Sequence, residues 1–94
     1  MTALIIQNQQ DTANEVVLNP GDVTIGRSRD NDLPIKDATV SARHAKIVTF
    51  FDVSYIEDLH STNGTYLNGK RITKHTLHDG DEIRLGKQCL TFKK

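Results

Sequence analysis

Apolar residues recur along this chain in short runs that are broken by turn residues. The segments 45–51 and 53–59 alternate well enough for strands, and 82–85 alternates polar and apolar positions, which is typical of a strand with one buried face. Further apolar or β-branched runs that predict strands lie at 4–6, 15–18, 23–25 and 89–92, and 76–77 leads into a turn. No window of about eleven residues repeats apolar groups at helical spacing. The pattern therefore predicts an all-β chain without helices.

Turn residues separate these predicted strands. The segment 19–22 places Pro second and Gly third, as type II turns prefer, and 78–81 and 86–87 are further predicted turns. Asn68-Gly69 lies between two strand-like segments, and both Asn and Gly accept positive φ angles. We therefore expect a tight hairpin at this pair.

Two longer polar segments, 7–14 and 27–40, predict loops, and the second contains short apolar positions at Leu33 and Ile35. Many short strands joined by turns favour a β-sandwich or a barrel. The loops of such a sandwich gather at its two ends, where a rigid scaffold holds binding residues. With 94 residues and no internal repeat or linker, 1–94 is expected to form one minimal domain, which can belong to a longer protein.

The amino-acid composition argues against several classes of protein. Apolar residues make up 36% of the chain, aromatic residues only 5%, and Trp is absent, so the core must come mainly from Ile, Leu and Val. The formal net charge is zero, which argues against a non-specific binder of nucleic acid or of a membrane surface. No apolar run reaches membrane-spanning length and none resembles a signal peptide. We therefore expect a reducing, cytoplasmic compartment.

The Cys, His and acidic residues of this chain do not show the spacing of a metal site. The single Cys89 excludes an internal disulfide and a multi-cysteine metal site, and its apolar run predicts a buried thiol. Three histidines near predicted turns lack metal-ligand spacing and are expected at the surface: His60, His75 and His78. The acidic turn 79–82 resembles a calcium loop only weakly and lacks its full ligand spacing. We expect no metal and no cofactor.

The segment 60–69, HSTNGTYLNG, holds a second Asn-Gly pair, Asn63-Gly64, which is too close to the first to form another hairpin. It follows the predicted strand 53–59, so it is expected to shape a polar loop. That loop would display hydroxyls, a carboxamide and backbone N–H groups together, a set that suits an anion or a peptide backbone. A plain surface loop is the alternative.

Three polar segments fall between predicted strands, so a sandwich can bring them together at one end: Gly26-Arg27-Ser28, Ser41-Ala42-Arg43-His44 and Ser61-Thr62-Asn63-Gly64. Arginine presents a planar fork that matches phosphate oxygens, and Ser and Thr hydroxyls donate to the same oxygens. The chain has no acidic pair, no Cys/His ligand set and no Walker-type glycine loop. The combination favours anion recognition.

The runs GRSRDNDLPIKDATVSARHAKI, YIEDLHSTNGTYLNGKRI and LHDGDEIRLG together resemble the forkhead-associated (FHA) domain family, over about 23–92. The motif is Gly-Arg, then Ser-x-x-His, then Ser/Thr-x-Asn-Gly, and it is specific as a set. The resemblance implies a β-sandwich of about eleven mostly antiparallel strands. It also implies a phosphothreonine-peptide-binding module, not an enzyme, with its ligand loops at one end.

The resemblance assigns roles to individual residues. Arg27 and Ser41 resemble the family's phosphate contacts, and Thr62 resembles a third, through its hydroxyl or its N–H. Asn63 resembles the Asn whose carboxamide pairs with the peptide backbone beside the phosphothreonine. Further candidate peptide contacts are Ser28, Arg43, Ser61 and Lys70.

Three other residues are assigned to support of the site. Gly26 and Gly64 resemble backbone positions where a Cβ would not fit, and His44 resembles a structural histidine that braces the loops. Ala42 is a departure from the family, because many relatives carry Lys, Arg or Asn directly after the motif Ser. The missing donor bears on affinity more than on function.

Each of these assignments has a simpler alternative. Arg27 could form a surface ion pair with Asp30 or Asp32. Ser41 could only cap a turn, and Asn63 could serve only to reach a left-handed backbone conformation.

Three functional hypotheses follow. The first is a signalling or assembly module that binds phosphothreonine on a partner protein or within its own full-length chain, and is a monomer as an isolated domain. The second is a domain that binds a partner without phosphate. The third is an enzyme that uses Ser41 and His44, which lacks a suggestive acidic third residue and an oxyanion site.

Overall fold

The computed structural model describes residues 3–7 and 14–94. Its strands are β1 (Ala3–Gln7), β2 (Asn14–Val17), β3 (Gly21–Gly26), β4 (Leu33–Pro34), β5 (Ala45–Phe50), β6 (Val53–Asp58), β7 (Thr65–Leu67), β8 (Lys70–Ile72), β9 (Lys74–Leu77), β10 (Glu82–Leu85) and β11 (Gln88–Lys93). Of the predicted loop 7–14, Gln7 and Asn14 are strand residues, and 8–13 lie outside the described residues. The described chain has no helix, and hence none that could cross a membrane.

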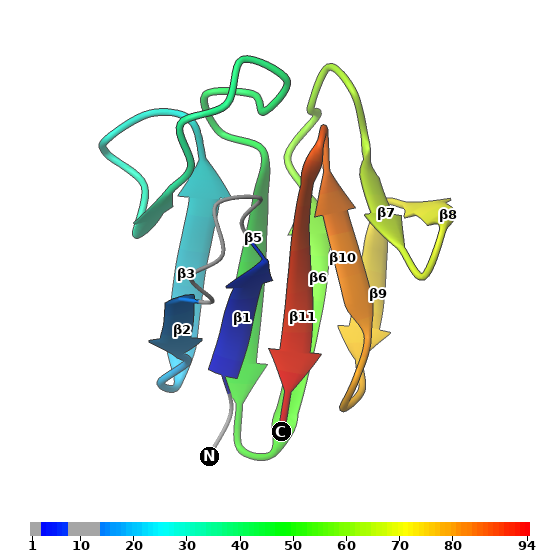
Figure 1. Ribbon diagram of the computed structural model, residues 1–94. Coiled ribbons are helices and arrows are strands. Elements are labelled where there is room, and N and C mark those ends of the chain that lie inside the picture. Colours follow the sequence, from blue (N-terminus) through cyan, green and yellow to red (C-terminus); the bar gives the residue numbers. More distant parts are fainter. Residues whose placement is uncertain (1–2, 8–13) are drawn as a thin grey trace.

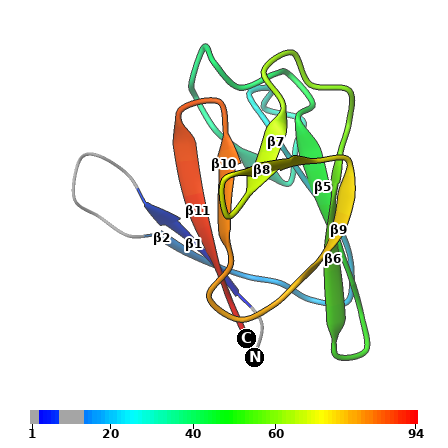
Figure 2. The same ribbon diagram turned by 90° about the vertical axis from the view of Figure 1, so that its right-hand side faces the viewer.

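The strands form two packed sheets, as the sandwich prediction requires (Figure 1). One sheet has the order β2-β1-β11-β10-β7-β8, and the other has the order β4-β3-β5-β6-β9. Neighbouring strands are antiparallel, apart from β3 and β4, which pair in parallel through Ile25 and Leu33. Figure 2 shows the two sheets side on, with β10 and β11 facing β5 and β6.

The core lies between the sheets and follows the period-two alternation of the strands. Its largest fully buried side chains include Ile47 and Ile56 from one sheet and Leu90 and Phe92 from the other. Leu90 and Phe92 take the inward positions of β11, so Cys89, one residue before Leu90, points outward and is exposed. The prediction of a buried thiol at Cys89 was therefore wrong, because strand alternation overrides the burial habit of free Cys.

The predicted turns have the expected backbone conformations. Asn68 and Gly69 have φ angles of 49° and 87°, and Leu67 pairs with Lys70 across them. Two successive positive φ angles define the type I′ hairpin expected from an Asn-Gly pair. Gly21 has a φ of 116°, and Gly80, in the turn between β9 and β10, has a φ of 87°.

The connections β3–β4, β4–β5 and β6–β7 meet at one end of the sandwich, the top in Figure 1. The chain leaves β11 at the opposite end, so the C-terminus lies away from these loops (Figure 1). The three polar segments predicted to act together are therefore neighbours in space. His60, His75 and His78 are exposed, as predicted, and no group of three metal-binding side chains occurs among the described residues.

We expect Ile56→Ala to lower the free energy of unfolding by about 2–5 kcal/mol, because it leaves a cavity where a fully buried side chain packs. Val53→Ala, on the same strand, removes a side chain that is 53% exposed and should cost less than about 1 kcal/mol. Chemical denaturation of both variants measures the difference. Equal losses would contradict the placement of the core.

Candidate functional site

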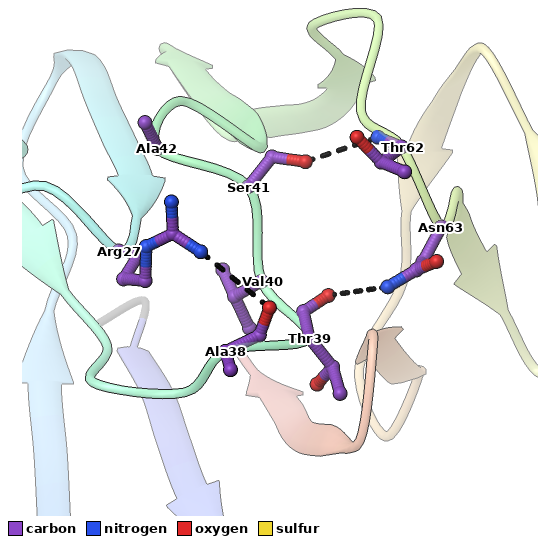
Figure 3. Close-up of a pocket in the computed structure, with 8 residues that line it drawn as sticks. All are labelled: Arg27, Ala38, Thr39, Val40, Ser41, Ala42, Thr62 and Asn63. Carbon is purple, nitrogen blue, oxygen red and sulfur yellow. Dashed lines mark hydrogen bonds between the residues drawn. The ribbon is translucent and has the colours of Figure 1, made fainter.

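A pocket of about 210 Å³ opens at the loop end of the sandwich (Figure 3). Its lining residues are Arg27, Ala38, Thr39, Val40, Ser41, Ala42, Thr62 and Asn63. The four residues predicted as principal contacts, Arg27, Ser41, Thr62 and Asn63, all belong to this set. They come from three different loops, so the fold brings together residues that the sequence keeps apart.

Arg27 directly follows β3, and its exposed side chain lines the pocket. Its backbone N–H donates to Ser41 O at 2.9 Å, and its Nη1 lies 3.4 Å from Ala38 O. Among the described residues it forms no ion pair, and Asp32 instead accepts hydrogen bonds from Thr24. The guanidinium is the charged group among the lining residues, and no carboxylate lines the pocket with it. Because the pocket lining carries a positive charge and no negative charge, the pocket favours an anion over a cation.

Ser41 is hydrogen-bonded across two loops. The backbone N–H of Thr62 donates to Ser41 Oγ at 3.0 Å, as Figure 3 shows. Because that oxygen accepts from Thr62, the hydroxyl proton of Ser41 remains available for an acceptor in the pocket. The alternative of a simple turn cap does not describe this bond, which joins residues 21 positions apart.

Asn63 is held by its carboxamide. Its Nδ2 donates to Thr39 O at 2.8 Å (Figure 3). One Nδ2 hydrogen takes part in this bond, so the second hydrogen and Oδ1 are left to pair with a ligand. Asn63 does not have a positive φ; in this loop the positive φ angles fall on His60, at 58°, and Gly64, at 87°. The alternative that Asn63 serves only a left-handed backbone is therefore wrong.

His44 lies beneath the pocket with no exposed surface. Its Nδ1 accepts the N–H of Ser41 at 3.1 Å, which leaves the ring proton on Nε2, and Nε2 donates to Gly64 O at 2.9 Å. One imidazole thus joins the β4–β5 loop to the β6–β7 loop. With both ring nitrogens bonded to backbone groups, His44 is not placed to take a proton from the Ser41 hydroxyl.

Close backbone approach explains the glycines. A Cβ on Gly26 would lie 2.2 Å from Ala42 O, closer than any real contact. Gly64 has a positive φ, and a Cβ there would lie 2.8 Å from Nε of Arg71. Sequence reasoning missed Gly86, where a Cβ would lie 2.4 Å from Thr39 O. Because Gly86 has no Cβ, the β10–β11 hairpin can pack against the β4–β5 loop.

The β4–β5 loop is fixed by Asp37, which sequence reasoning also missed. Its carboxylate accepts from Thr39 N at 2.8 Å, from Thr39 Oγ1 at 2.5 Å and from Gln88 Nε2 at 2.6 Å. Thr39 Oγ1 in turn accepts the N–H of Lys87 at 2.9 Å. The hydrogen bonds from Thr39 and Gln88 lower the pKa of Asp37 to about 2. In its ionised form, Asp37 therefore connects the β4–β5 loop to the β10–β11 hairpin.

Ser61, a candidate peptide contact, is buried and occupied within its own loop. Its hydroxyl donates to Asp58 Oδ1 at 2.5 Å and accepts from Gly64 N at 2.9 Å. Thr65 also donates to Asp58, at 2.7 Å. Burial raises the pKa of Asp58, but the hydrogen bonds from Ser61 and Thr65 outweigh it and hold that pKa below its usual value. Ser61 therefore supports the loop from inside.

The other candidate contacts lie outside the pocket lining. Ser28 is half-buried and donates its N–H to Ala42 O at 3.2 Å, while Arg43 and Lys70 are exposed. Asn31, which the sequence did not single out, is buried and donates from Nδ2 to Ser28 O and to Ala42 O. These bonds hold the loop after β3 against the β4–β5 loop.

The three loops, the histidine between them and the pocket form the pattern that the motif predicted. A family model described as "FHA domain" matches residues 23–86. The chain belongs to the FHA family. The match lies within the segment, about 23–92, in which the sequence resembles the family, and it includes all four principal pocket residues.

The chain is also similar to individual curated proteins. Over 75 residues the chain is 43% identical to the ABC transporter ATP-binding/permease protein Rv1747 of Mycobacterium tuberculosis, which covers 80% of this chain and 9% of that protein. The chain spans less than two thirds of the length of the first curated relatives that it matches.

Two solved structures illustrate the likeness of fold. The FHA domain of FhaA from Mycobacterium tuberculosis, complexed with the intracellular domain of Rv3910, has a TM-score of 0.92 and 32% identity, over 99% of this chain and 100% of that one. Mycobacterium tuberculosis EmbR in complex with a low affinity phosphopeptide has a TM-score of 0.86 and 34% identity, over 97% of this chain and 24% of that one. The all-β sandwich is the fold of this family.

His44→Ala should lower the free energy of unfolding by at least about 1–3 kcal/mol, because it leaves the N–H of Ser41 and the carbonyl of Gly64 without their partner. Arg43→Ala, which removes the exposed neighbouring side chain, should change stability by less than about 0.5 kcal/mol. Thermal denaturation tests both. An unaltered melting temperature in His44→Ala would show that the ring does not brace the loops.

The lowered pKa of Asp37 predicts that the fold loses stability in acid. Its pKa falls from 3.8 to about 2 on folding, so its contribution to stability is complete above about pH 4 and is lost as the pH falls through about 2. Asp58 contributes in the same direction. Asp37→Asn should reduce stability at neutral pH and flatten the acid decline, as denaturation midpoints between about pH 2 and pH 6 would show. Parallel pH curves for the two proteins would contradict the assignment.

Proposed function

We propose that this chain is a non-catalytic module that binds peptides containing phosphothreonine. The observation that carries the proposal is the pocket at the loop end, where the Arg27 guanidinium, the Ser41 and Thr62 hydroxyls and the Asn63 carboxamide converge without a carboxylate. Membership of the FHA family and the likeness to a phosphopeptide complex of EmbR support it. Hydrogen bonds from such donors to a dianionic phosphate are charge-assisted, and each is stronger than a bond between neutral groups.

The structure suggests a division of roles. Arg27 offers a charged fork, and Ser41 offers a hydroxyl proton that is free because its oxygen already accepts from Thr62. Thr62 would contact the phosphate through its own hydroxyl, since its N–H donates to Ser41. Asn63, held by Thr39 O, would pair with the peptide backbone beside the phosphothreonine.

The pocket also has apolar surface for the threonine side chain. Ala38 and Ala42 are exposed lining residues, whereas Val40 is fully buried in the core beneath them. Burying one extra methyl group contributes about 0.8 kcal/mol, or about a fourfold preference for phosphothreonine over phosphoserine. The contact set is small, so affinities in the micromolar range that weaken with salt are expected.

An enzymatic role receives no support from the geometry around Ser41 and His44, because both ring nitrogens of His44 are bonded to backbone groups. Protein kinases use ATP to make phosphothreonine, and both are found in the cytoplasm. A module that binds phosphothreonine is therefore expected to be cytoplasmic. The phosphorylated segment would belong to a partner protein or to another part of a longer chain, and the isolated domain would be a monomer.

Arg27→Ala should weaken binding of a phosphothreonine peptide by at least about tenfold, since each hydrogen bond to a charged group contributes roughly 1.5–3 kcal/mol. Arg29→Ala is the matched control, because Arg29 is exposed in the same loop but does not line the pocket. Calorimetry with phosphorylated and phosphatase-treated peptide measures both. Unchanged affinity in folded Arg27→Ala, or equal binding of the two peptides by the wild type, would contradict the proposal.

Ala42→Lys should tighten binding about two- to fivefold, because Ala42 is exposed at the pocket and a lysine there adds a partly solvated charge–charge contact of about 0.5–1 kcal/mol. The gain should shrink as salt is raised. Titrations at two salt concentrations, with and without the phosphate on the peptide, test it. An equal gain for the unphosphorylated peptide would mean that this loop does not face the phosphate.

A further inference from the structure

The β5–β6 hairpin carries exposed apolar side chains at the end of the sandwich opposite the pocket (Figure 1). Phe50 is 67% exposed and Phe51 is 83% exposed, and their rings meet edge to face with centroids 4.5 Å apart. Val53, which pairs with Phe50 across the turn, is 53% exposed. Single exposed apolar residues are ordinary, whereas a contiguous group of them is typical of an interaction surface.

This apolar surface continues along the outer face of the sheet. Strand alternation turns Val48 and Tyr55 to the same face as Phe50 and Val53, and Val48 pairs with Tyr55 in the next outward row. Both side chains are half-buried. We name the five residues the hairpin patch: Val48, Phe50, Phe51, Val53 and Tyr55.

The stability of the turn does not explain Phe51. It is the first of the two turn residues between Phe50 and Val53 and has a φ of 57°, whereas Asp52 has no positive φ. Turns of this kind prefer glycine at that position, because a positive φ is unfavourable for a bulky side chain. The Phe51 ring is mostly exposed, so its burial stabilises the fold little. A residue that strains the backbone with so little packing indicates a role outside the fold.

The size and charge of the hairpin patch argue against two kinds of occupant. The two exposed Phe rings supply on the order of 300 Å² of apolar surface, whereas a stable interface between two copies buries about 800 Å² on each. Asp52 is exposed beside Phe51, and insertion of the turn into a membrane would bring its carboxylate into hydrocarbon. A short segment of another protein fits this surface better.

The backbone beneath the patch restricts the form of that segment. β5 lies between β3 and β6, and β6 lies between β5 and β9, so the sheet already uses the backbone groups of both strands. The partner must therefore satisfy its own backbone groups, which an α-helix does internally. It would contact the patch through side chains alone, as the apolar stripe of an amphipathic helix does.

The free charge on the β9 side of the patch is positive. Nζ of Lys74 lies 4.5 Å from the centroid of the Tyr55 ring, and Lys74 takes part in no ion pair within the described part of the chain. Glu57, its cross-strand neighbour, lies 3.7 Å from Lys46 instead. A pocket of about 360 Å³ opens here without a carboxylate in its lining, which consists of Tyr55, Lys74, His75 and Thr76.

We propose that the hairpin patch docks an amphipathic helix of a partner protein, with apolar side chains against Phe50 and Phe51 and a carboxylate at Lys74. Asp22, which pairs with Val48, places a negative charge on the other flank, so the same helix would carry its basic residues there. The inference does not depend on the proposed function, because the patch and the phosphothreonine pocket lie at opposite ends of the sandwich (Figure 1). One domain can therefore hold a phosphorylated segment and a second protein together.

The test uses two synthetic helical peptides that share one stripe of Leu and Phe and carry either Glu or Lys along one flank. In NMR titrations the Glu peptide should shift the amide signals of Val48, Phe50 and Val53. It should bind about two- to fivefold more tightly than the Lys peptide, because the contact with Lys74 is solvated. Lys74→Gln should remove this preference.

Variants of the patch separate docking from folding. Phe50→Thr combined with Phe51→Gly should weaken binding of the Glu peptide by at least about tenfold. Val17→Thr is the matched control, because Val17 is 44% exposed on β2 of the other sheet, and it should bind like the wild type. Phe51→Gly alone should keep or raise the melting temperature, since glycine accepts a positive φ. A lowered melting temperature would show that Phe51 serves the fold, and would overturn the role assigned to it.

The remaining outcomes distinguish this proposal from the proposed function. Arg27→Ala, or saturation with a phosphothreonine peptide, should leave binding of the Glu peptide unchanged. Absence of shifts at the patch with either peptide, or equal binding by the wild type and the double Phe variant, would overturn the docking site. Patch-dependent dimers in sedimentation, or patch-dependent binding to phosphatidylcholine–phosphatidylserine vesicles, would also overturn it, because the patch would then have a different occupant.

Discussion

The site depends on one imidazole. His44 accepts the N–H of Ser41 and donates to the carbonyl of Gly64, and so fixes two loops that carry three of the four principal pocket residues. The ring is fully buried, where a hydrogen bond is costly to leave unmade. Because His44 immediately precedes β5, the loops take their position from the sandwich beneath them.

A second set of bonds fixes the remaining side of the pocket. Asp37 holds Thr39, Thr39 O accepts from Asn63, and Lys87 and Gln88 attach the same loop to the β10–β11 hairpin. The pocket groups are therefore ordered before a ligand arrives, which reduces the entropy lost on binding. The same bonds hold the Asn63 carboxamide against the β4–β5 loop at the pocket.

Much of the fold could be predicted from local pattern. Alternation indicated β5, β6 and β10, and the Asn68-Gly69 pair predicted the β7–β8 hairpin, because both signals depend on adjacent residues. The principal pocket residues followed from the FHA motif. What escaped prediction depends on contacts distant in sequence, such as Asp37 with Gln88, 51 positions apart. The exposure of Cys89 and the burial of Ser61 likewise follow from which face or loop interior each residue occupies, which composition does not specify.

The most direct test of the account is an NMR titration of the labelled domain with a phosphothreonine peptide and its unphosphorylated counterpart. The account predicts that the phosphorylated peptide shifts the backbone amide signals of Arg27, Ser41, Thr62 and Asn63, with little change at the opposite end of the sandwich, where β5 turns into β6. The unphosphorylated peptide should shift none of them. Shifts that cluster away from the loop end, or that are the same for both peptides, would contradict phosphate recognition by this pocket.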